Sequence, residues 1–374
     1  MPGIRYRELG RTGSKISEVS LGTEHLRKPP STVAKVVRRA LDGGINYLDL
    51  VFNLPDYLRA YGNAIEGRRG DIMLSHHLGS AERNGRYMKT REPALCEKVL
   101  NNALSLLKTD YIDVANVHFV KTAKEYADVA ADGGVLDLAS HLKEEGLARF
   151  VGISTHDISV VKQAAESGRF DVVMFQINLA NNSLLGRDDA LAACMRNGVG
   201  VLAMKPFAGG RLLMRDKTIR FHGYLRGGSS HIKQRVPDST SVARCLSYTL
   251  SQIGVSSAVA GVRKLSELDE ILSYGNAAPE EKDFSGLLKD FQQYSAGECV
   301  YCDHCLPCPM NIEIGEVLRL LDATSGGVTA RIRKDYGALG AKASDCNGCG
   351  ACSDRCPFSV DVEVEMQRAK DILG

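Results

Sequence analysis

Cysteine spacing is the feature that most constrains this chain. Three of its 11 cysteines are isolated, and the other eight fall in two runs, Cys299, Cys302, Cys305 and Cys308 before Pro309, then Cys346, Cys349, Cys352 and Cys356 before Pro357. Cysteines spread evenly along the chain would suggest a disulfide scaffold, whereas tight C-x-x-C runs in a long chain indicate metal ligation. We therefore expect a large domain over residues 1–280 and a metal-binding domain over residues 281–374.

The spacing within the runs favours iron–sulfur clusters. The second run has the bacterial ferredoxin pattern, and the first is one residue shorter. Four thiolates also make a tetrahedral zinc site, so zinc remains an alternative. In two-cluster ferredoxins the fourth cysteine of each run usually serves the other cluster. The expected [4Fe-4S] groups are therefore Cys299, Cys302, Cys305 and Cys356, and Cys346, Cys349, Cys352 and Cys308.

The first 275 residues alternate between short apolar runs and longer helical stretches. Eight strands are expected, at 19–25, 47–50, 72–77, 111–118, 150–155, 172–178, 200–205 and 258–261. Eight strand–helix pairs in about 260 residues predict an α/β fold of the (β/α)8 TIM-barrel class. The rival, a doubly wound sheet, is disfavoured because no strand is followed by G-x-G-x-x-G. Residues 4–19 are expected to form a hairpin that closes the barrel bottom, and residues 312–321 a helix in the ferredoxin-like module.

Composition excludes several classes of protein. Apolar residues make up 44% and charged residues 25% of the chain, which are globular values and argue against disorder. A net charge of +2 gives no reason to expect a nucleic-acid or membrane-surface partner. No apolar run reaches the ~20 residues of a membrane span, and the first residues have no signal-peptide core. We expect a cytoplasmic protein, and its oligomeric state cannot be predicted.

Titratable side chains gather at the predicted strand ends, where barrel enzymes carry their chemistry. Five of the nine histidines are placed there, together with two carboxylates and a lysine: Glu24, His25, Asp49, His76, His77, His118, His156 and Lys205. A single histidine at such a place is more often structural. Because several of these titratable groups converge on one rim of the barrel, we predict that at least two of them take part in chemistry. His76 and His77 are adjacent in a strand and must point to opposite faces, so one of them is expected to face the mouth.

Residues 4–275 resemble the aldo-keto reductase family, in the branch that carries a ferredoxin-like module. The segments that resemble it are LGRTG at 9–13, GGINYLD at 43–49, YIDV at 111–114 with His118, GIS at 152–154, FQINL at 175–179, KPFAGG at 205–210 and GVRK at 261–264. The resemblance implies carbonyl reduction with NADPH by Asp, Tyr, Lys and His. Asp49 and His118 match two of these four. The Tyr position is Leu54 and the Lys position is His77. Tyr57, three residues after Leu54, is the phenol that could take the vacant place.

The resemblance also implies a nucleotide site that is only partly retained. Ser154 and Gln176 match residues that hold the nicotinamide amide, and Arg263 and Glu270 match residues around the adenosine phosphate and adenine. The Asn expected after that Ser is Thr155, and the one expected after that Glu is Ile271. An Arg at a strand–helix turn is nevertheless a suitable phosphate anchor.

These features leave three hypotheses of function. The first is an iron–sulfur oxidoreductase that acts on a small oxygenated organic substrate, with electrons from NADP(H) or through the clusters and a partner protein. The second is a non-redox lyase, isomerase or dehydratase, in which the rim histidines and Asp49 act as acid and base or bind a divalent metal such as Zn, Fe or Mn. The third is a redox-sensing subunit without catalysis. Family resemblance favours the first, and the loss of Tyr and Lys favours the second.

Overall fold

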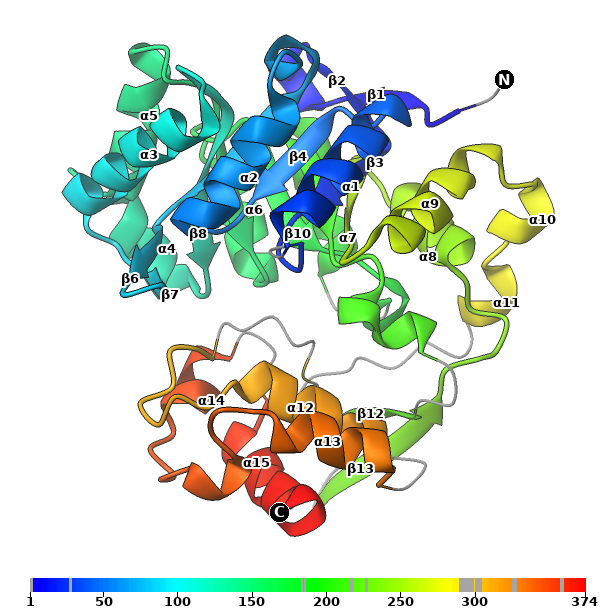
Figure 1. Cartoon of the computed structure of the whole chain (residues 1–374). Helices are drawn as coiled ribbons and strands as arrows, with labels where there is room; N and C mark the ends of the chain where they lie inside the picture. Colours follow the sequence, from blue (N-terminus) through cyan, green and yellow to red (C-terminus); the bar gives the residue numbers. More distant parts are fainter. Residues whose placement is uncertain are drawn as a thin grey trace. The chain divides into compact units, whose positions relative to one another are not determined.

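The computed structural model describes residues 3–26, 29–182, 184, 186–214, 218–225, 228–288, 299, 305–324, 328–356 and 360–374. The chain forms two compact units (Figure 1). The first consists of residues 1–178, 185–206 and 242–284, and the second of residues 179–184, 207–241 and 285–374. No helix among the described residues is both long and apolar enough to span a bilayer.

The first unit is a closed barrel of eight parallel strands, as the alternation of apolar runs and helical stretches predicts. In barrel order they are β3 (Val19–Gly22), β4 (Tyr47–Leu50), β5 (Met73–Leu78), β8 (Ile112–Val120), β9 (Ala148–Thr155), β10 (Val172–Gln176), β11 (Gly200–Met204) and β14 (Val255–Gly261), which pairs back onto β3. All eight expected strands are confirmed. Parallel strands place all their carboxyl ends at one mouth, so the titratable strand ends meet there.

Amphipathic helices surround the strands (Figure 1). They are α1 (Pro30–Asp42), α2 (Pro55–Ile65), α3 (Pro93–Leu107), α4 (Ala123–Ala130), α5 (Val135–Glu144), α6 (Ile158–Glu166), α7 (Arg187–Arg196), α8 (Val242–Ser251), α9 (Leu265–Ser273) and the short α10 (Pro279–Lys282). Proline begins α1, α2, α3 and α10, where its missing N–H costs no hydrogen bond. Asp157 caps α6 by accepting from the backbone of Ser159 and Val160.

A short hairpin closes the barrel bottom, as expected. It pairs β1 (Tyr6–Glu8) with β2 (Lys15–Ser17), and its Leu9 and Ile16 pack with barrel-interior side chains such as Tyr47 and Met174. Gly10 has a φ of +51°, and a Cβ there would lie 2.3 Å from the backbone nitrogen of Gly200. Only glycine allows the hairpin to approach β11 this closely.

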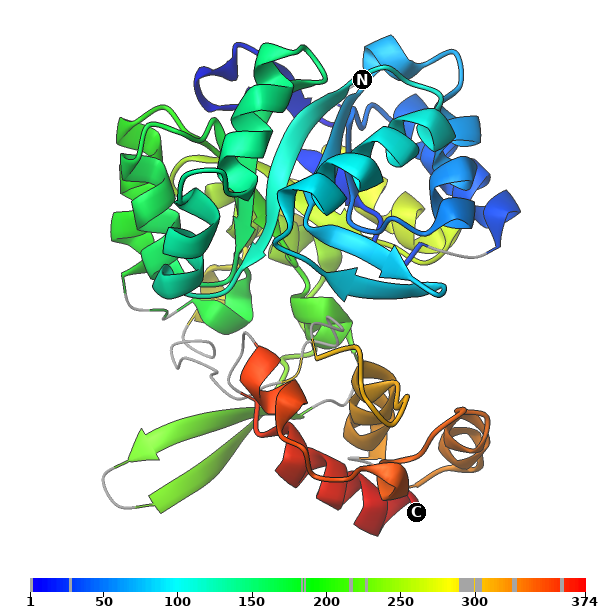
Figure 2. The same ribbon diagram turned by 90° about the vertical axis from the view of Figure 1, so that its left-hand side faces the viewer.

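A second hairpin interrupts the barrel between β5 and α3. It pairs β6 (Ser80–Arg83) with β7 (Arg86–Lys89) through the turn Asn84-Gly85, both with positive φ (Figure 2, light blue). Asn-Gly is the preferred pair for a two-residue turn of this kind. The hairpin begins after Gly79, which has a φ of +100°. Glycine is required at this position because a Cβ would lie 2.8 Å from the carbonyl of Thr90. The hairpin therefore starts at the carboxyl end of β5, beside the barrel mouth.

The second unit is mainly helical around its own core. Its helices are α11 (Ser285–Leu288), α12 (Ile314–Ala323), α13 (Ala330–Gly337), α14 (Ala351–Arg355) and α15 (Val362–Leu373), and it also contains the antiparallel pair β12 (Thr218–Leu225) and β13 (Gly228–Arg235) (Figure 2, light green). The expected helix at 312–321 is confirmed as α12. Its core contains Val317, Leu321 and Met366, and Cys305 and Cys352 are buried within it.

Candidate functional site

Three of the predicted rim residues lie on neighbouring barrel strands. Asp49 is on β4, His77 on β5 and His118 on β8, and all three are buried, with exposed fractions of 3–4%. A bulge between Val117 and Val120 shifts the register of β8, and Phe119 within it has a φ of +40°. Such bulges at barrel rims change the direction of neighbouring side chains. The structure therefore brings the three residues together.

Hydrogen bonds join these residues in a continuous row. His77 Nε2 lies 3.0 Å from Asp49 Oδ1, and His77 Nδ1 lies 2.9 Å from His118 Nδ1. The row continues from His118 Nε2 to the hydroxyl of Tyr87, at 2.8 Å. The Ser154 hydroxyl lies farther from His77 Nδ1, at 3.5 Å, and accepts a hydrogen bond from the backbone of Phe119 at 2.8 Å. Asp49, His77, His118 and Tyr87, in this order, are called the relay below.

Tyr87 was not found from the sequence. It lies on β7, in the inserted hairpin, and its ring packs edge-on against Phe52 and His118, with centroid distances of 5.7 and 5.8 Å. The Asn84-Gly85 pair between two short segments was the available signal, because it predicts a hairpin directly after the β5 histidines. A phenol therefore reaches the mouth from an element that the strand pattern does not include.

The adjacent His76 points away from the relay, as the alternation of a strand requires. Its Nε2 lies 2.7 Å from Asn53 Oδ1. Complete burial, with a smaller contribution from the charge of His77, lowers the pKa of His76 to about 3. His76 is therefore a neutral structural group at physiological pH.

His76 gives the protein a predictable sensitivity to acid. Its pKa is about 3 when folded and about 6.5 when unfolded, so the unfolded chain binds more protons between these values. Stability contributed by neutral His76 is present above pH 6.5 and falls as the pH decreases towards 3, by about 2 kcal/mol between pH 7 and pH 5. His76→Gln keeps a donor for Asn53 and should flatten the dependence of melting temperature on pH over this interval. An unchanged slope in this variant would contradict the assignment.

The positions around the expected tyrosine hold no free phenol. Leu54 is the residue that precedes α2, with backbone angles of an extended chain. Tyr57, in the first turn of α2, is 2% exposed and its hydroxyl is hydrogen-bonded to Thr23. The Thr23 hydroxyl in turn donates to the backbone carbonyl of Asp49 at 2.5 Å. The Tyr57 hydroxyl is therefore held by this hydrogen bond and is not part of the relay.

The nicotinamide side of the expected nucleotide site lies on β9 and β10. Ser154 and Gln176 are both buried at these strand ends. Gln176 is hydrogen-bonded to His156, whose pKa is well below its usual value because of complete burial and, secondarily, the nearby charge of Lys205. Lys205 follows β11 with a left-handed backbone, at φ +56°. These groups form a second polar cluster beside the relay strands.

The residues expected around the adenosine phosphate lie at the end of β14. Arg263 is exposed, and its guanidinium is 3.3 Å from Glu267, whose carboxylate also accepts from the Arg263 backbone at 2.8 Å. Glu270, one turn farther along α9, is exposed. His25 is likewise exposed, and its ring is near Gly261. The structure does not bring Arg263, Glu270 or His25 into the relay.

The relay geometry does not fit the divalent-metal hypothesis. Both ring nitrogens of His77 are within hydrogen-bond distance of relay neighbours, which leaves no lone pair directed at an ion. Across the residues that the structure describes, no three His, Cys, Asp or Glu side chains are grouped closely enough to hold one metal ion. The imidazoles instead form a row of hydrogen bonds.

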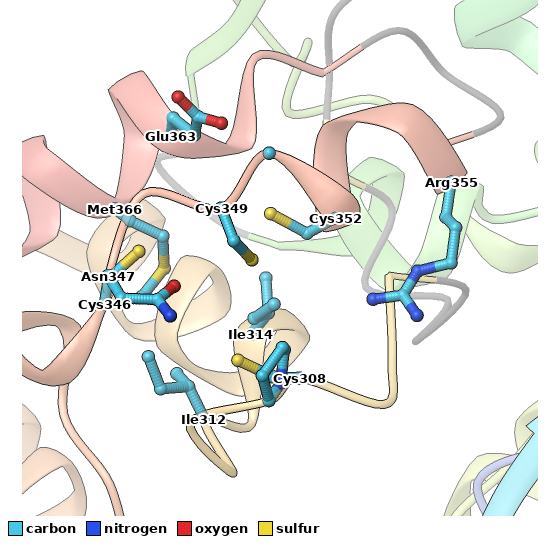
Figure 3. Close-up of a pocket in the computed structure, with 12 residues that line it drawn as sticks. Cys308, Ile312, Ile314, Cys346, Asn347, Cys349, Cys352, Arg355, Glu363 and Met366 are labelled. Carbon is cyan, nitrogen blue, oxygen red and sulfur yellow. The ribbon is translucent and has the colours of Figure 1, made fainter.

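The second unit has a pocket lined by cysteines from both runs. Cys308 comes from the first run, and Cys346, Cys349 and Cys352 come from the second, and their sulfurs point towards one another (Figure 3). This is the set that the crossed ligand pattern predicts. The donor set fits a [4Fe-4S] cluster, because each thiolate there binds a different iron. Four thiolates are also the donor set of a tetrahedral zinc site, so the pocket alone does not choose between the two.

Two arginines organise the chain around the remaining cysteines. Arg355, beside Cys356, donates to the carbonyl of Cys305 at 2.6 Å, which connects the two runs. Arg211 is 3% exposed and donates to the carbonyl of Cys299 at 2.7 Å. Cys299 and Cys305 of the other expected group are thus each held by an arginine of the second unit, while Cys302 lies outside the described residues.

Comparison with known proteins accounts for both units. Residues 18–289 match the "Aldo/keto reductase family", and residues 298–361 match the "4Fe-4S dicluster domain". The chain belongs to the aldo/keto reductase family. It is an oxidoreductase-family barrel joined to an iron–sulfur domain, as the resemblance and the cysteine spacing predicted.

Relatives of this aldo/keto reductase match mainly the barrel. The chain is 28% identical to "Uncharacterized oxidoreductase YqkF" of Bacillus subtilis over 73% of its own length and 92% of the relative. It is 26% identical to "L-galactose dehydrogenase" of Arabidopsis thaliana over 72% and 88%. A solved aldo-keto reductase from Bacillus halodurans aligns with a TM-score of 0.62 at 23% identity, over 78% of this chain and all of that one. This last likeness shows the fold alone.

Proposed function

We propose that this aldo/keto reductase catalyses an oxidoreduction of a small oxygenated organic substrate with an altered proton-transfer site. The carrying observation is the row of hydrogen bonds from Asp49 through His77 to His118 at the barrel mouth. In the proposal, Leu54 and His77 occupy the family's Tyr and Lys positions, and Asp49, His77 and His118 are the catalytic groups. An imidazole can both accept and donate a proton, which suits His77 and His118 to deliver the proton that the family's phenol would have delivered.

NADP(H) is the proposed hydride donor or acceptor. Ser154 and Gln176 would hold the nicotinamide amide, and Arg263 and Glu270 the adenosine end. Two observations support this placement: Ser154 and Gln176 are buried polar groups at adjacent strand ends, and Arg263 is exposed at a strand–helix turn. When bound, the nucleotide supplies the electron pair, and the protein's own residues supply and remove the proton.

The second unit is proposed to carry two [4Fe-4S] clusters. Cys308, Cys346, Cys349 and Cys352 would hold one, supported by their shared pocket. Cys299, Cys302, Cys305 and Cys356 would hold the other, supported by the Arg355 bridge between the runs. Two such clusters suit one-electron exchange with a partner protein in a reducing compartment, the cytoplasm. We place the domain boundary at residues 280–281.

Iron content tests this assignment. Anaerobically purified protein should contain about eight irons per chain and a brown absorbance that bleaches on reduction. Cys349→Ala should lower the iron content, because it removes one ligand of the pocket set. Cys194→Ala is the matched control, since that thiol is buried in the barrel and should leave the iron unchanged. Stoichiometric zinc without iron would overturn the proposed electron transfer.

A second candidate, a non-redox lyase, isomerase or dehydratase, is favoured by one observation. The relay joins a carboxylate, two imidazoles and a phenol, which suffices for acid–base chemistry without a hydride. Protein incubated with NADPH deuterated at C4 separates the two candidates. Nucleotide binding followed by deuterium in the product supports oxidoreduction. Conversion of the substrate without deuterium transfer supports the second candidate.

A further inference from the structure

The hairpin that carries Tyr87 is fixed at both ends. At its start, the carbonyl of Ser80 accepts a hydrogen bond from Asn53 Nδ2 at 2.5 Å. At its end, the Lys89 ammonium lies 2.5 Å from the Glu125 carboxylate. A side chain held between two such anchors keeps its position relative to the barrel strands. The contact between Tyr87 and His118 is therefore a built feature of the mouth.

The relay has a self-consistent arrangement of protons. A carboxylate only accepts hydrogen bonds, so Asp49 requires the proton of neutral His77 to be on Nε2. The Nδ1 of His77 then accepts from His118 Nδ1–H, and the Nε2 of His118 accepts from the Tyr87 hydroxyl. Each of the three short contacts, 3.0, 2.9 and 2.8 Å long, thus has one donor and one acceptor.

One added proton reverses the two hydrogen bonds made by His118 and leaves the His77 Nε2–H donating to Asp49. His77 then carries protons on both nitrogens and is stabilised by Asp49, and its Nδ1–H donates to His118 Nδ1. His118 Nε2–H donates to the Tyr87 oxygen. The Tyr87 O–H is thereby released to donate to another acceptor. Because Tyr87 is half-buried while the other three members are at most 4% exposed, this acceptor lies at the Tyr87 end.

We propose that Tyr87 is the catalytic acid and base of the mouth, and that it exchanges its proton with the substrate oxygen at one side and with His118 at the other. Tyr87 would donate the proton that the family's tyrosine donates, but from a different element of the fold. This inference therefore rests on the proposed function. In the reducing direction, a bound nucleotide would supply the hydride, and the substrate oxygen would need one proton. The Tyr87 O–H bond breaks and a substrate O–H bond forms.

The relay then refills Tyr87 without any change of electrons. Tyr87 takes the Nε2 proton of His118, His118 takes the Nδ1 proton of His77, and His77 returns to its neutral form beside Asp49. In the oxidising direction the same proton moves inward, and His77 retains it. His77 thus holds the proton, and Asp49 stabilises its charge.

The test compares Tyr87→Phe with Tyr57→Phe. Both variants lose one hydroxyl and keep a ring that packs edge-on against Phe52, but only Tyr87 is hydrogen-bonded to His118. The first readout is nitrogen NMR of protein labelled with ¹⁵N-histidine, with the His118 signals assigned from His118→Gln. Tyr87→Phe should shift the Nε2 signal of His118, and Tyr57→Phe should leave it in place.

The second readout is turnover of NADPH with glyceraldehyde and methylglyoxal as probes, at high enzyme concentration. Tyr87→Phe should lower kcat by about 10²-fold or more, and Tyr57→Phe should not. The inference would be overturned if the Nε2 signal of His118 is unchanged in Tyr87→Phe. It would also be overturned if Tyr87→Phe is as active as Tyr57→Phe. If wild type turns over neither probe while Tyr87→Phe still shifts the His118 signal, carbonyl reduction fails as the proposed function and the proton relay is supported.

Discussion

Replacing His77 or His118 with glutamine should lower turnover by about 10²-fold or more, the usual scale for a general acid–base group. Each substitution interrupts the relay, because glutamine keeps polar atoms but does not titrate. The natural probe is whichever oxygenated compound the wild type converts fastest with NADPH. His141→Gln is the control, since His141 is exposed on α5 and pairs with Glu145.

Stability must be measured beside turnover in these variants. Both histidines are 3% exposed and hydrogen-bonded, so their replacement also affects stability. Their removal leaves the Asp49 carboxylate or the other imidazole without a partner, which costs about 1–3 kcal/mol. Glutamine is chosen over alanine for this reason. A variant that melts early while its folded fraction stays fully active would assign these histidines a purely structural role.

The second large effect concerns Leu54 and simple aldehydes. Hydride transfer to a carbonyl leaves an alkoxide that needs a proton at once, and a leucine side chain has none to give. The relay offers its proton from β5, β8 and the hairpin, so the approach differs from that of a phenol at position 54. We expect wild-type turnover of simple aldehydes to be slow and measurable only at high enzyme concentration. Leu54→Tyr alone should restore little, because His77 still occupies the expected lysine position.

The barrel was predictable because its signal is repeated along the chain. Eight apolar runs separated by helical stretches admit few folds, and strands such as β4 begin and end where the sequence placed them. The meeting of Asp49, His77 and His118 followed from the same reasoning, since parallel strands end at one mouth. The crossed grouping of Cys308 with the second run was likewise predicted from spacing, and these cysteines share a pocket.

The chemistry of the mouth was less predictable, because it depends on side-chain orientation. Strand position does not reveal that His77 and His118 face each other through their Nδ1 atoms, and this contact is what connects the two halves of the relay. Tyr87 was missed because its hairpin is an insertion outside the strand–helix repeat. The Asn84-Gly85 turn predicts a hairpin, but it does not predict which barrel side chain that hairpin reaches.

The most direct measurement is NADPH oxidation with a panel of small aldehydes by wild type, Leu54→Tyr and the Leu54→Tyr/His77→Lys double variant. If proton transfer has moved from the family's Tyr and Lys positions to the histidine relay, wild type and Leu54→Tyr should both stay far below the ~10 s⁻¹ of a typical enzyme. The double variant, with a phenol and an ammonium beside Asp49, should be faster than either. Wild-type turnover comparable to ~10 s⁻¹ on these aldehydes would contradict the proposed change of site.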